Sequence, residues 1–482
     1  MKARSFEQNG ITVQSQSWKR KLAHSAERIL SGMSMGRVHS PRFLPLLYLV
    51  ICIPTVLFLI FFRQPLGSPD ELSHVARAYQ ISKGVLLTEE AVPGLHPKGM
   101  VDQGLLDLGS QVSRRRFESL NTALPIFQSY GWMGAEKLRR FNSSVYFPAA
   151  FIPQAIGLKV AQKLNLKLVQ SLQLASILNA AVCLLIVALA IHLAVEGRSI
   201  IAFIGALPMS LHQLASPSPD GILIAGSLLM ASITVTAIVQ AKVSRSTLLG
   251  VVILGALTAA TKLPYLGIAL AALGALWWIE PRSSRKNLGY VFAFIGLVSI
   301  PVLWAKISNA STVRHSLLTQ VDPSAQLAFL LSHPLEIPVI AFSTLYTLWR
   351  SYLAQVVGIL GWLDAPLPPI AYGILGLGFA AILAMDGVPV KPLLRWIFLA
   401  GSAVSVALIF LGLYLVWTPL FSLGPIEGVQ GRYFLPILPF LMFLIPKLKS
   451  FDSNNLKLLI FMICGLVGGF STMTAIINRY YS

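Results

Sequence analysis

The chain has 482 residues, of which 55% are hydrophobic and only 12% are charged. Soluble globular proteins carry about 25% charged residues, so this composition excludes a soluble protein and indicates an integral membrane protein. The formal net charge is +19. The basic residues lie beside apolar runs, which favours the lipid bilayer over nucleic acid as the partner of this charge.

Residues 1–42 form a polar tail rich in Lys and Arg, and the first apolar run follows from Phe43 to Phe62. A run of about 20 residues is long enough for one transmembrane helix. It is too long for the core of a signal peptide, and no small-residue cleavage site follows it. We therefore expect a basic cytoplasmic tail, 1–42, and a polytopic membrane domain, 43–480.

Further apolar runs continue to the end of the chain. They lie at 170–195, 199–214, 221–241, 247–261, 264–279, 288–306, 369–385, 396–417, 433–446 and 457–478. With the first run they predict an all-α integral membrane protein of about 11 transmembrane helices. The segments 147–163 and 337–356 are interrupted by polar residues or proline, which predicts re-entrant or surface-lying helices.

The basic residues alternate between the short connections. Every second connection carries Lys or Arg and the intervening ones carry almost none, as the positive-inside rule describes. This pattern predicts a cytoplasmic N-terminus and an outward C-terminus. Two long loops, 63–168 and 307–368, then lie outside the cell together with Asp220, Lys262 and Arg432. Long polar connections in compact proteins usually carry function.

The first outward loop begins with Asp70, Glu71 and His74. In one interpretation these are helix-start residues, because Ser68 and Glu71 have the spacing of a capping box. In the other, Asp70 is a general base and Glu71, His74 and Arg77 orient it or tune its acidity. Asp70 and Glu71 are also the candidates for binding Mg²⁺ or Mn²⁺, although one histidine and two acids form a weak metal signature.

Two further ionisable residues stand at the ends of apolar runs. Asp220 begins a run and is read either as a capping residue or as an ionisable group with a partner at membrane depth. Lys262 lies between two short runs in a stretch with no other charge nearby. It is read either as a snorkelling lysine or as an anchor for a phosphate group.

The last outward segment contains Arg432 and Tyr433 after a glycine-rich stretch. A guanidinium binds phosphate oxygens in pairs, so substrate binding is one interpretation. An ion pair with Glu427 or anchoring at the membrane interface is the other. Trp362 and Asp364 allow a similar choice between an interfacial aromatic residue and a binding platform for a sugar or an acceptor.

Several short blocks of this sequence resemble a known family. They are Pro69-Asp70-Glu71 with His74, Arg77, Ala78 and Tyr79, Tyr146-Phe147-Pro148 with Pro153-Gln154-Ala155, Gly358 with Gly361-Trp362-Leu363-Asp364, and Gly428-Val429-Gln430-Gly431-Arg432-Tyr433-Phe434-Leu435-Pro436. They resemble the bacterial membrane proteins of domain of unknown function 2142, over roughly residues 45–480. The Gln-Gly-Arg-Tyr-Phe-Leu-Pro block is the most specific of them.

The layout of that family is similar to GT-C glycosyltransferases, polytopic enzymes that use polyprenyl-phosphate sugars. The resemblance implies a GT-C-like fold with juxtamembrane helices in the first outward loop, and a place in the bacterial plasma membrane. It also implies that Asp70, with Glu71, matches the acidic motif of those enzymes. The donor would be a lipid-linked sugar and the acceptor an envelope glycan or a lipid.

The resulting hypothesis is an inverting, extracytoplasmic glycosyltransferase. Asp70 and Glu71 are its catalytic residues, and its substrate-binding residues are His74, Arg77, Asp220, Lys262, Trp362, Asp364, Arg432 and Tyr433. The rival hypotheses are a transporter or flippase of a lipid-linked glycan and a non-catalytic protein of envelope assembly. Transporters often contain internal repeats, and no later segment repeats the Pro-Asp-Glu of the first loop.

Overall fold

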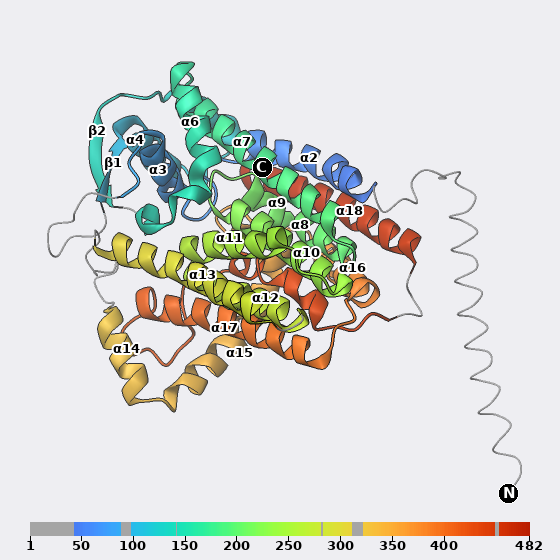
Figure 1. Cartoon of the computed structure of the whole chain (residues 1–482). Helices are drawn as coiled ribbons and strands as arrows, with labels where there is room; N and C mark the ends of the chain where they lie inside the picture. Colours follow the sequence, from blue (N-terminus) through green and yellow to red (C-terminus); the bar gives the residue numbers. More distant parts are fainter. Residues whose placement is uncertain (1–42, 88–97, 141, 281–282, 311–321, 449–452) are drawn as a thin grey trace, which may run out of the picture.

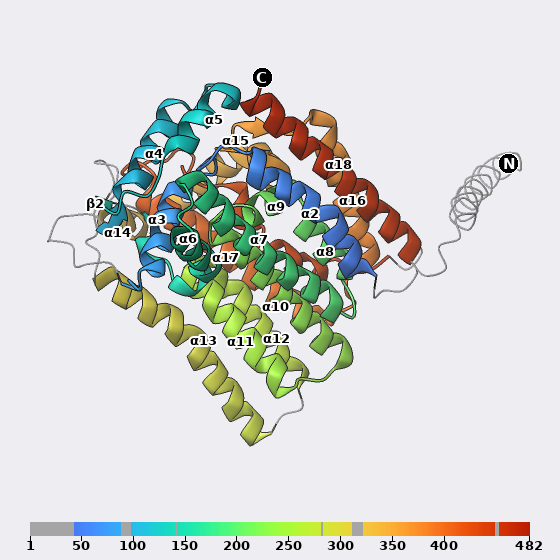
Figure 2. The same cartoon turned by 90° about the horizontal axis from the view of Figure 1, so that it is seen from above.

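The computed structural model describes residues 43–87, 98–140, 142–280, 283–310, 322–448 and 453–482. These residues are mostly helical, and long helices lie side by side in one bundle (Figure 1). The view from above shows α4 and α5 at one end of that bundle, near the C-terminus (Figure 2). The expected basic tail, 1–42, lies outside the described residues.

Seven helices in the described part of the chain are long and apolar enough to cross a membrane. They are α2 (Leu44–Phe62), α7 (Leu168–Leu193), α10 (Asp220–Gln240), α13 (Ser284–Ala310), α16 (Pro369–Asp386), α17 (Pro392–Val416) and α18 (Asn454–Tyr480). The count rises to eight if α14 (Pro323–Ser332) and α15 (Glu336–Gly358), which are bent by 112° at their break, form one span.

This count differs from the expected eleven because several apolar runs form shorter elements. These elements are α8 (Arg198–Ala206), α9 (Pro208–Leu214), α11 (Arg245–Thr261), η3 (Leu263–Tyr265), α12 (Leu266–Ile279), η4 (Gly431–Phe434) and η5 (Leu438–Phe443). Prolines explain much of the difference, since they disfavour helix in the preceding residue. Leu207 is extended before Pro208, and 3-10 turns replace a span where Pro436 and Pro439 interrupt the run 433–446.

The first long loop contains folded elements that pack against the bundle. They are α3 (Glu71–Ser82), β1 (Lys98–Asp102), α4 (Gln103–Arg114), α5 (Leu120–Ser129), β2 (Glu136–Arg140), η1 (Asn142–Val145), η2 (Pro148–Phe151) and α6 (Ile152–Lys163). Strands β1 and β2 pair antiparallel, with Met100 opposite Leu138. Helix α6 packs on α3 and α7. The segment 147–163, expected to be re-entrant or surface-lying, therefore forms η2 and α6, and α6 packs against the bundle.

The second long loop contains α14 and α15, followed by a short turn between β3 (Ile359–Leu360) and β4 (Ala365–Pro366). The segment 337–356, expected to be re-entrant or surface-lying, lies within α15. Helix α15 contacts η4, which carries Arg432. Gly431 permits this contact, because a Cβ there would lie 2.5 Å from the Gln355 Cβ.

Antiparallel neighbours bring the candidate residues to one end of the bundle. Helix α10 begins at Asp220 and its neighbour α11 ends at Thr261, so Asp220 and Lys262 lie at the same end. The last residues of α18 reach the end of α2, where the Tyr481 hydroxyl donates to the Phe62 carbonyl at 3.0 Å. The first residues of α18 lie at the opposite end of that helix.

Candidate functional site

The turn between α2 and α3 presents Asp70 at the start of α3. Asp70 has a positive φ of 62°, and it precedes the first helical residue, Glu71. Its side chain caps no backbone N–H group. The expected capping box is half formed, because the Ser68 N–H donates to the Glu71 carboxylate at 2.8 Å, while the helix begins two residues later than a Ser68 cap requires. A left-handed, non-capping aspartate is a strained arrangement of the kind found at functional sites.

Glu71 is fully enclosed by the same turn. Its two carboxylate oxygens accept from Arg63 at 2.7 and 3.0 Å, and the residue is 1% exposed. Both oxygens are thus held by protein partners, so Glu71 with Asp70 does not fit a metal site. No group of three or more His, Cys, Asp or Glu that could hold a metal occurs in the part of the chain that the structure describes.

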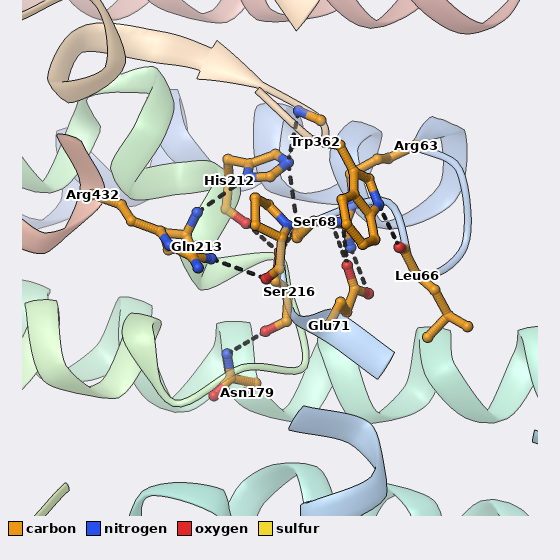
Figure 3. A network of polar contacts seen from close by, with 12 residues as sticks. Arg63, Leu66, Ser68, Glu71, Asn179, His212, Gln213, Ser216, Trp362 and Arg432 are labelled. Carbon is orange, nitrogen blue, oxygen red and sulfur yellow. Dashed lines mark hydrogen bonds and ion pairs between the residues drawn. The ribbon is translucent and has the colours of Figure 1, made fainter. Parts of the chain in front are cut away.

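A buried polar network fastens the α2–α3 turn to the bundle (Figure 3). The Ser68 hydroxyl lies 2.8 Å from the Ser216 hydroxyl and 3.4 Å from Nε2 of His212, and the Gly361 N–H donates to the same nitrogen at 3.3 Å. The Asn179 side-chain amide donates to the Ser216 carbonyl at 2.8 Å. Sequence reasoning missed His212, Ser216 and Asn179. The feature that could have identified them in the sequence is a polar side chain inside an apolar run or directly beside one.

Four charged side chains from distant segments meet beside this turn, and we call them the charged cluster: Asp70, Asp220, Lys262 and Arg432. Arg432 donates to Asp70 at 2.7 Å and to the Pro69 carbonyl at 3.0 Å. The Arg432 Nε lies 3.5 Å from one oxygen of Asp220, and Lys262 lies 2.5 Å from the other. Residues that contact one another in this cluster lie far apart in the sequence: 362 residues separate Asp70 from Arg432.

The charged cluster is open at one residue. The Asp70 side chain is 45% exposed, whereas those of Arg432, Asp220 and Lys262 are 2%, 6% and 13% exposed. With two carboxylates and two cations the cluster has no net charge when all four are ionised. Such pairing offsets the cost of burying each charge. Asp70 is therefore the member that a solute or lipid headgroup can reach most readily.

Aromatic rings line the cluster. The Lys262 ammonium lies 4.8 Å from the centre of the Tyr433 ring and 5.8 Å from that of Tyr146. The Tyr265 hydroxyl donates to the Tyr433 carbonyl at 3.1 Å. The Tyr146 ring also stacks on His74, with 6.0 Å between ring centres. These rings give Lys262 cation–π contacts and limit the directions in which its ammonium can turn.

The other predicted residues lie in different surroundings. The Arg77 guanidinium donates to the Leu86 carbonyl at 2.6 Å. It therefore holds the backbone that follows α3, and among the described residues it makes no hydrogen bond or ion pair with Asp70. Asp364 pairs with Arg479 at 2.8 Å and with Arg116 at 3.3 Å. The Trp362 indole N–H donates to the Leu66 carbonyl at 3.0 Å. Trp362 and Asp364 thus belong to a second group of residues, which contacts the 63–71 turn at Leu66 and not at the charged cluster.

A family model for predicted membrane proteins, DUF2142, matches residues 52–441. The chain belongs to the DUF2142 family. No curated protein and no solved structure matches it. All four members of the charged cluster lie within the matched DUF2142 segment, whereas Arg479 lies beyond it. The family description names no activity, so the function has to be argued from the geometry of the site.

The buried His74 is expected to make the stability of the protein sensitive to acid. Both of its ring nitrogens are buried and have no hydrogen-bond partner among the described residues. Burial lowers the pKa of His74 to about 4, against the opposing effect of the Asp220 and Asp70 carboxylates. Because the unfolded chain binds the proton more tightly, folded-state stability should fall as the pH drops from about 6.5 to about 4. His74→Gln should remove about 3 kcal/mol of this loss.

The measurement is the unfolding midpoint of purified protein between pH 7 and pH 4. His333→Gln is the matched control, because His333 is exposed at the C-terminal end of α14. It should leave the acid sensitivity unchanged. Equal acid sensitivity of the wild-type chain and His74→Gln would contradict a neutral, buried His74.

Proposed function

We propose that this membrane protein is an extracytoplasmic glycosyltransferase with a GT-C-like architecture. It transfers a sugar from a polyprenyl-phosphate-type donor to an envelope glycan or a lipid acceptor. The observation that carries this proposal is the charged cluster, in which a half-exposed carboxylate lies beside buried cations at the end of a helical bundle. That combination provides a base for an incoming hydroxyl and positive charge for a departing phosphate.

Asp70 is the general base in this proposal. Its carboxylate takes the proton of the acceptor hydroxyl while the acceptor oxygen bonds to the anomeric carbon of the donor sugar. The bond from that carbon to the phosphate oxygen breaks, and the phosphate leaves with the electron pair. Attack opposite the leaving group inverts the anomeric carbon. The exposure of Asp70 and its fixed backbone support this assignment over Glu71, whose oxygens face Arg63.

The two cations take different parts. Arg432 is the more deeply buried, and its terminal nitrogens already donate to Asp70 and to the Pro69 carbonyl. It is therefore a positioning residue that holds the base and the turn that carries it. Within the described residues Lys262 has one carboxylate partner, Asp220, and it is more exposed than Arg432. We assign the contact with the donor phosphate to Lys262, with Tyr433 as the ring beneath its ammonium.

Lys262→Met is expected to lower kcat/KM for the donor by about 10–100-fold, because one charge-assisted contact with the phosphate is lost. Lys262→Arg should recover much of this loss. Lys242→Met is the control, since Lys242 is an exposed lysine beyond the opposite end of α10. The assay follows release of polyprenyl phosphate from short-chain polyprenyl-phosphate sugars by purified protein in nanodiscs.

Equal kcat/KM values for Lys262→Met and Lys242→Met would contradict the role of Lys262. The same donors, labelled and placed in sealed vesicles, distinguish the enzyme from a flippase. Transfer of the label across the bilayer without release of polyprenyl phosphate would contradict the glycosyltransferase and favour transport.

A further inference from the structure

A cavity lies beside the 63–71 turn, where Leu66 and Trp362 meet. It has a volume of about 430 Å³ and is bounded by α4, the residues that follow α4, β2 and the turn between β3 and β4. Its polar lining comprises Gln64, Ser110, Ser113, Arg114, Arg116, Arg139 and Trp362, and we call it the arginine pocket. Leu66 also lines it, which places one face of the α2–α3 turn in its wall.

The arginine pocket has a strong excess of positive charge. Its lining includes three arginines and no acidic residue. Arg116 shares the Asp364 carboxylate with Arg479, so one negative charge faces two guanidiniums. Arg114 and Arg139 are exposed and have no ion pair within the described residues. Uncompensated guanidiniums around one cavity favour the binding of an anion, and phosphate oxygens match their forked donors best.

Trp362 gives the arginine pocket an oriented aromatic face. Its indole N–H is held by the Leu66 carbonyl, and the Arg116 guanidinium stacks on its ring with 5.1 Å between the guanidinium carbon and the ring centre. The residue is nevertheless 40% exposed. A fixed, accessible ring beside phosphate-binding groups can pack against the C–H groups of a glycerol or sugar moiety.

We propose that the arginine pocket binds the phosphate group of a phosphate ester, with the organic part of the ligand on Trp362. This site is distinct from the charged cluster, and it does not depend on the glycosyltransferase proposal. The 63–71 turn separates the two: Trp362 holds its Leu66 carbonyl from one side and Arg432 holds its Pro69 carbonyl from the other. The same phosphate chemistry occurs in soluble phosphate esters and in anionic lipid headgroups.

The test uses the full chain in phosphatidylcholine nanodiscs. In the first arm, glycerol 1-phosphate and inorganic phosphate are titrated by calorimetry. In the second arm, part of the phosphatidylcholine is replaced by phosphatidylglycerol, and the lipid retained by the protein is quantified by mass spectrometry. Arg114→Gln and Arg139→Gln should each weaken binding roughly tenfold. Trp362→Ala should weaken binding of glycerol 1-phosphate but not of inorganic phosphate.

Arg115→Gln is the matched control. Arg115 is the sequence neighbour of Arg114 and loses the same charge, but it pairs with Glu118 at 2.7 Å and does not line the arginine pocket. A loss in the first arm assigns a soluble phosphate ester, and a loss confined to the second arm assigns a lipid headgroup; either outcome supports the site. Equal binding by Arg114→Gln and Arg115→Gln in both arms, or no binding by the wild-type chain, would overturn it.

Discussion

Replacement of Asp70 by Asn is expected to lower turnover by about 10²–10⁴-fold, the contribution of a positioned general base. The fold should persist, because the Asp70 side chain is 45% exposed and caps no helix. An asparagine carbonyl still accepts from Arg432, but the amide cannot take up the proton of an acceptor hydroxyl. The measurement is the rate of polyprenyl phosphate release at saturating donor, together with the unfolding midpoint of each variant.

Glu427→Gln is the control for this experiment. Glu427 lies in the same segment as Arg432 and is exposed, and its backbone N–H donates a hydrogen bond to Thr418. Its replacement should leave turnover unchanged. Wild-type turnover in folded Asp70→Asn would exclude the proposed base and would return the charged cluster to a structural role.

Replacement of Glu71 by Gln is expected to cost about 3–5 kcal/mol of folding stability, because it leaves the guanidinium of Arg63 buried without its carboxylate. The side chains of the pair are 5% and 2% exposed, and two hydrogen bonds join them. The folded fraction of Glu71→Gln should keep its turnover, in contrast to Asp70→Asn. Denaturant unfolding in detergent, followed by an activity assay on the soluble fraction, separates the two effects.

A double-mutant cycle tests the coupling. Arg63→Met combined with Glu71→Met removes both buried charges, so the double variant should be less destabilised than the sum of the single variants. Additive losses would show that the pair contributes no coupling energy, and would remove the structural explanation for Glu71.

Much of the architecture follows from composition and from the pattern of apolar runs. The long runs predicted α2, α7, α10, α13, α16, α17 and α18 as candidate spans, and the structure confirms helices there. The count failed where prolines interrupt a run, as at Pro208 and Pro436, and where a run forms a helix of only 17 or 14 residues, as in α11 and α12. Hydropathy measures how apolar a segment is, but it does not report whether the backbone continues as a helix.

The candidate site was predictable in its residue types and not in its pairings. Charges in apolar surroundings singled out Asp220, Lys262 and Arg432, because isolated charges at membrane depth need partners. The sequence carried no information on which partner each would find. Glu427 is close to Arg432 in sequence and was one expected partner, yet Arg432 pairs with Asp70, 362 residues away.

By itself, the sequence determined that this is a multi-pass membrane protein of the DUF2142 family, with acidic residues at helix starts and cations between apolar runs. Only the tertiary structure distinguished the two neighbouring acids: Glu71 is enclosed by Arg63, while the side chain of Asp70, in a left-handed turn, is 45% exposed. The physical reason is that burial and ion pairing depend on which helices pack together. Local periodicity specifies the apolar face of a helix but not its neighbour.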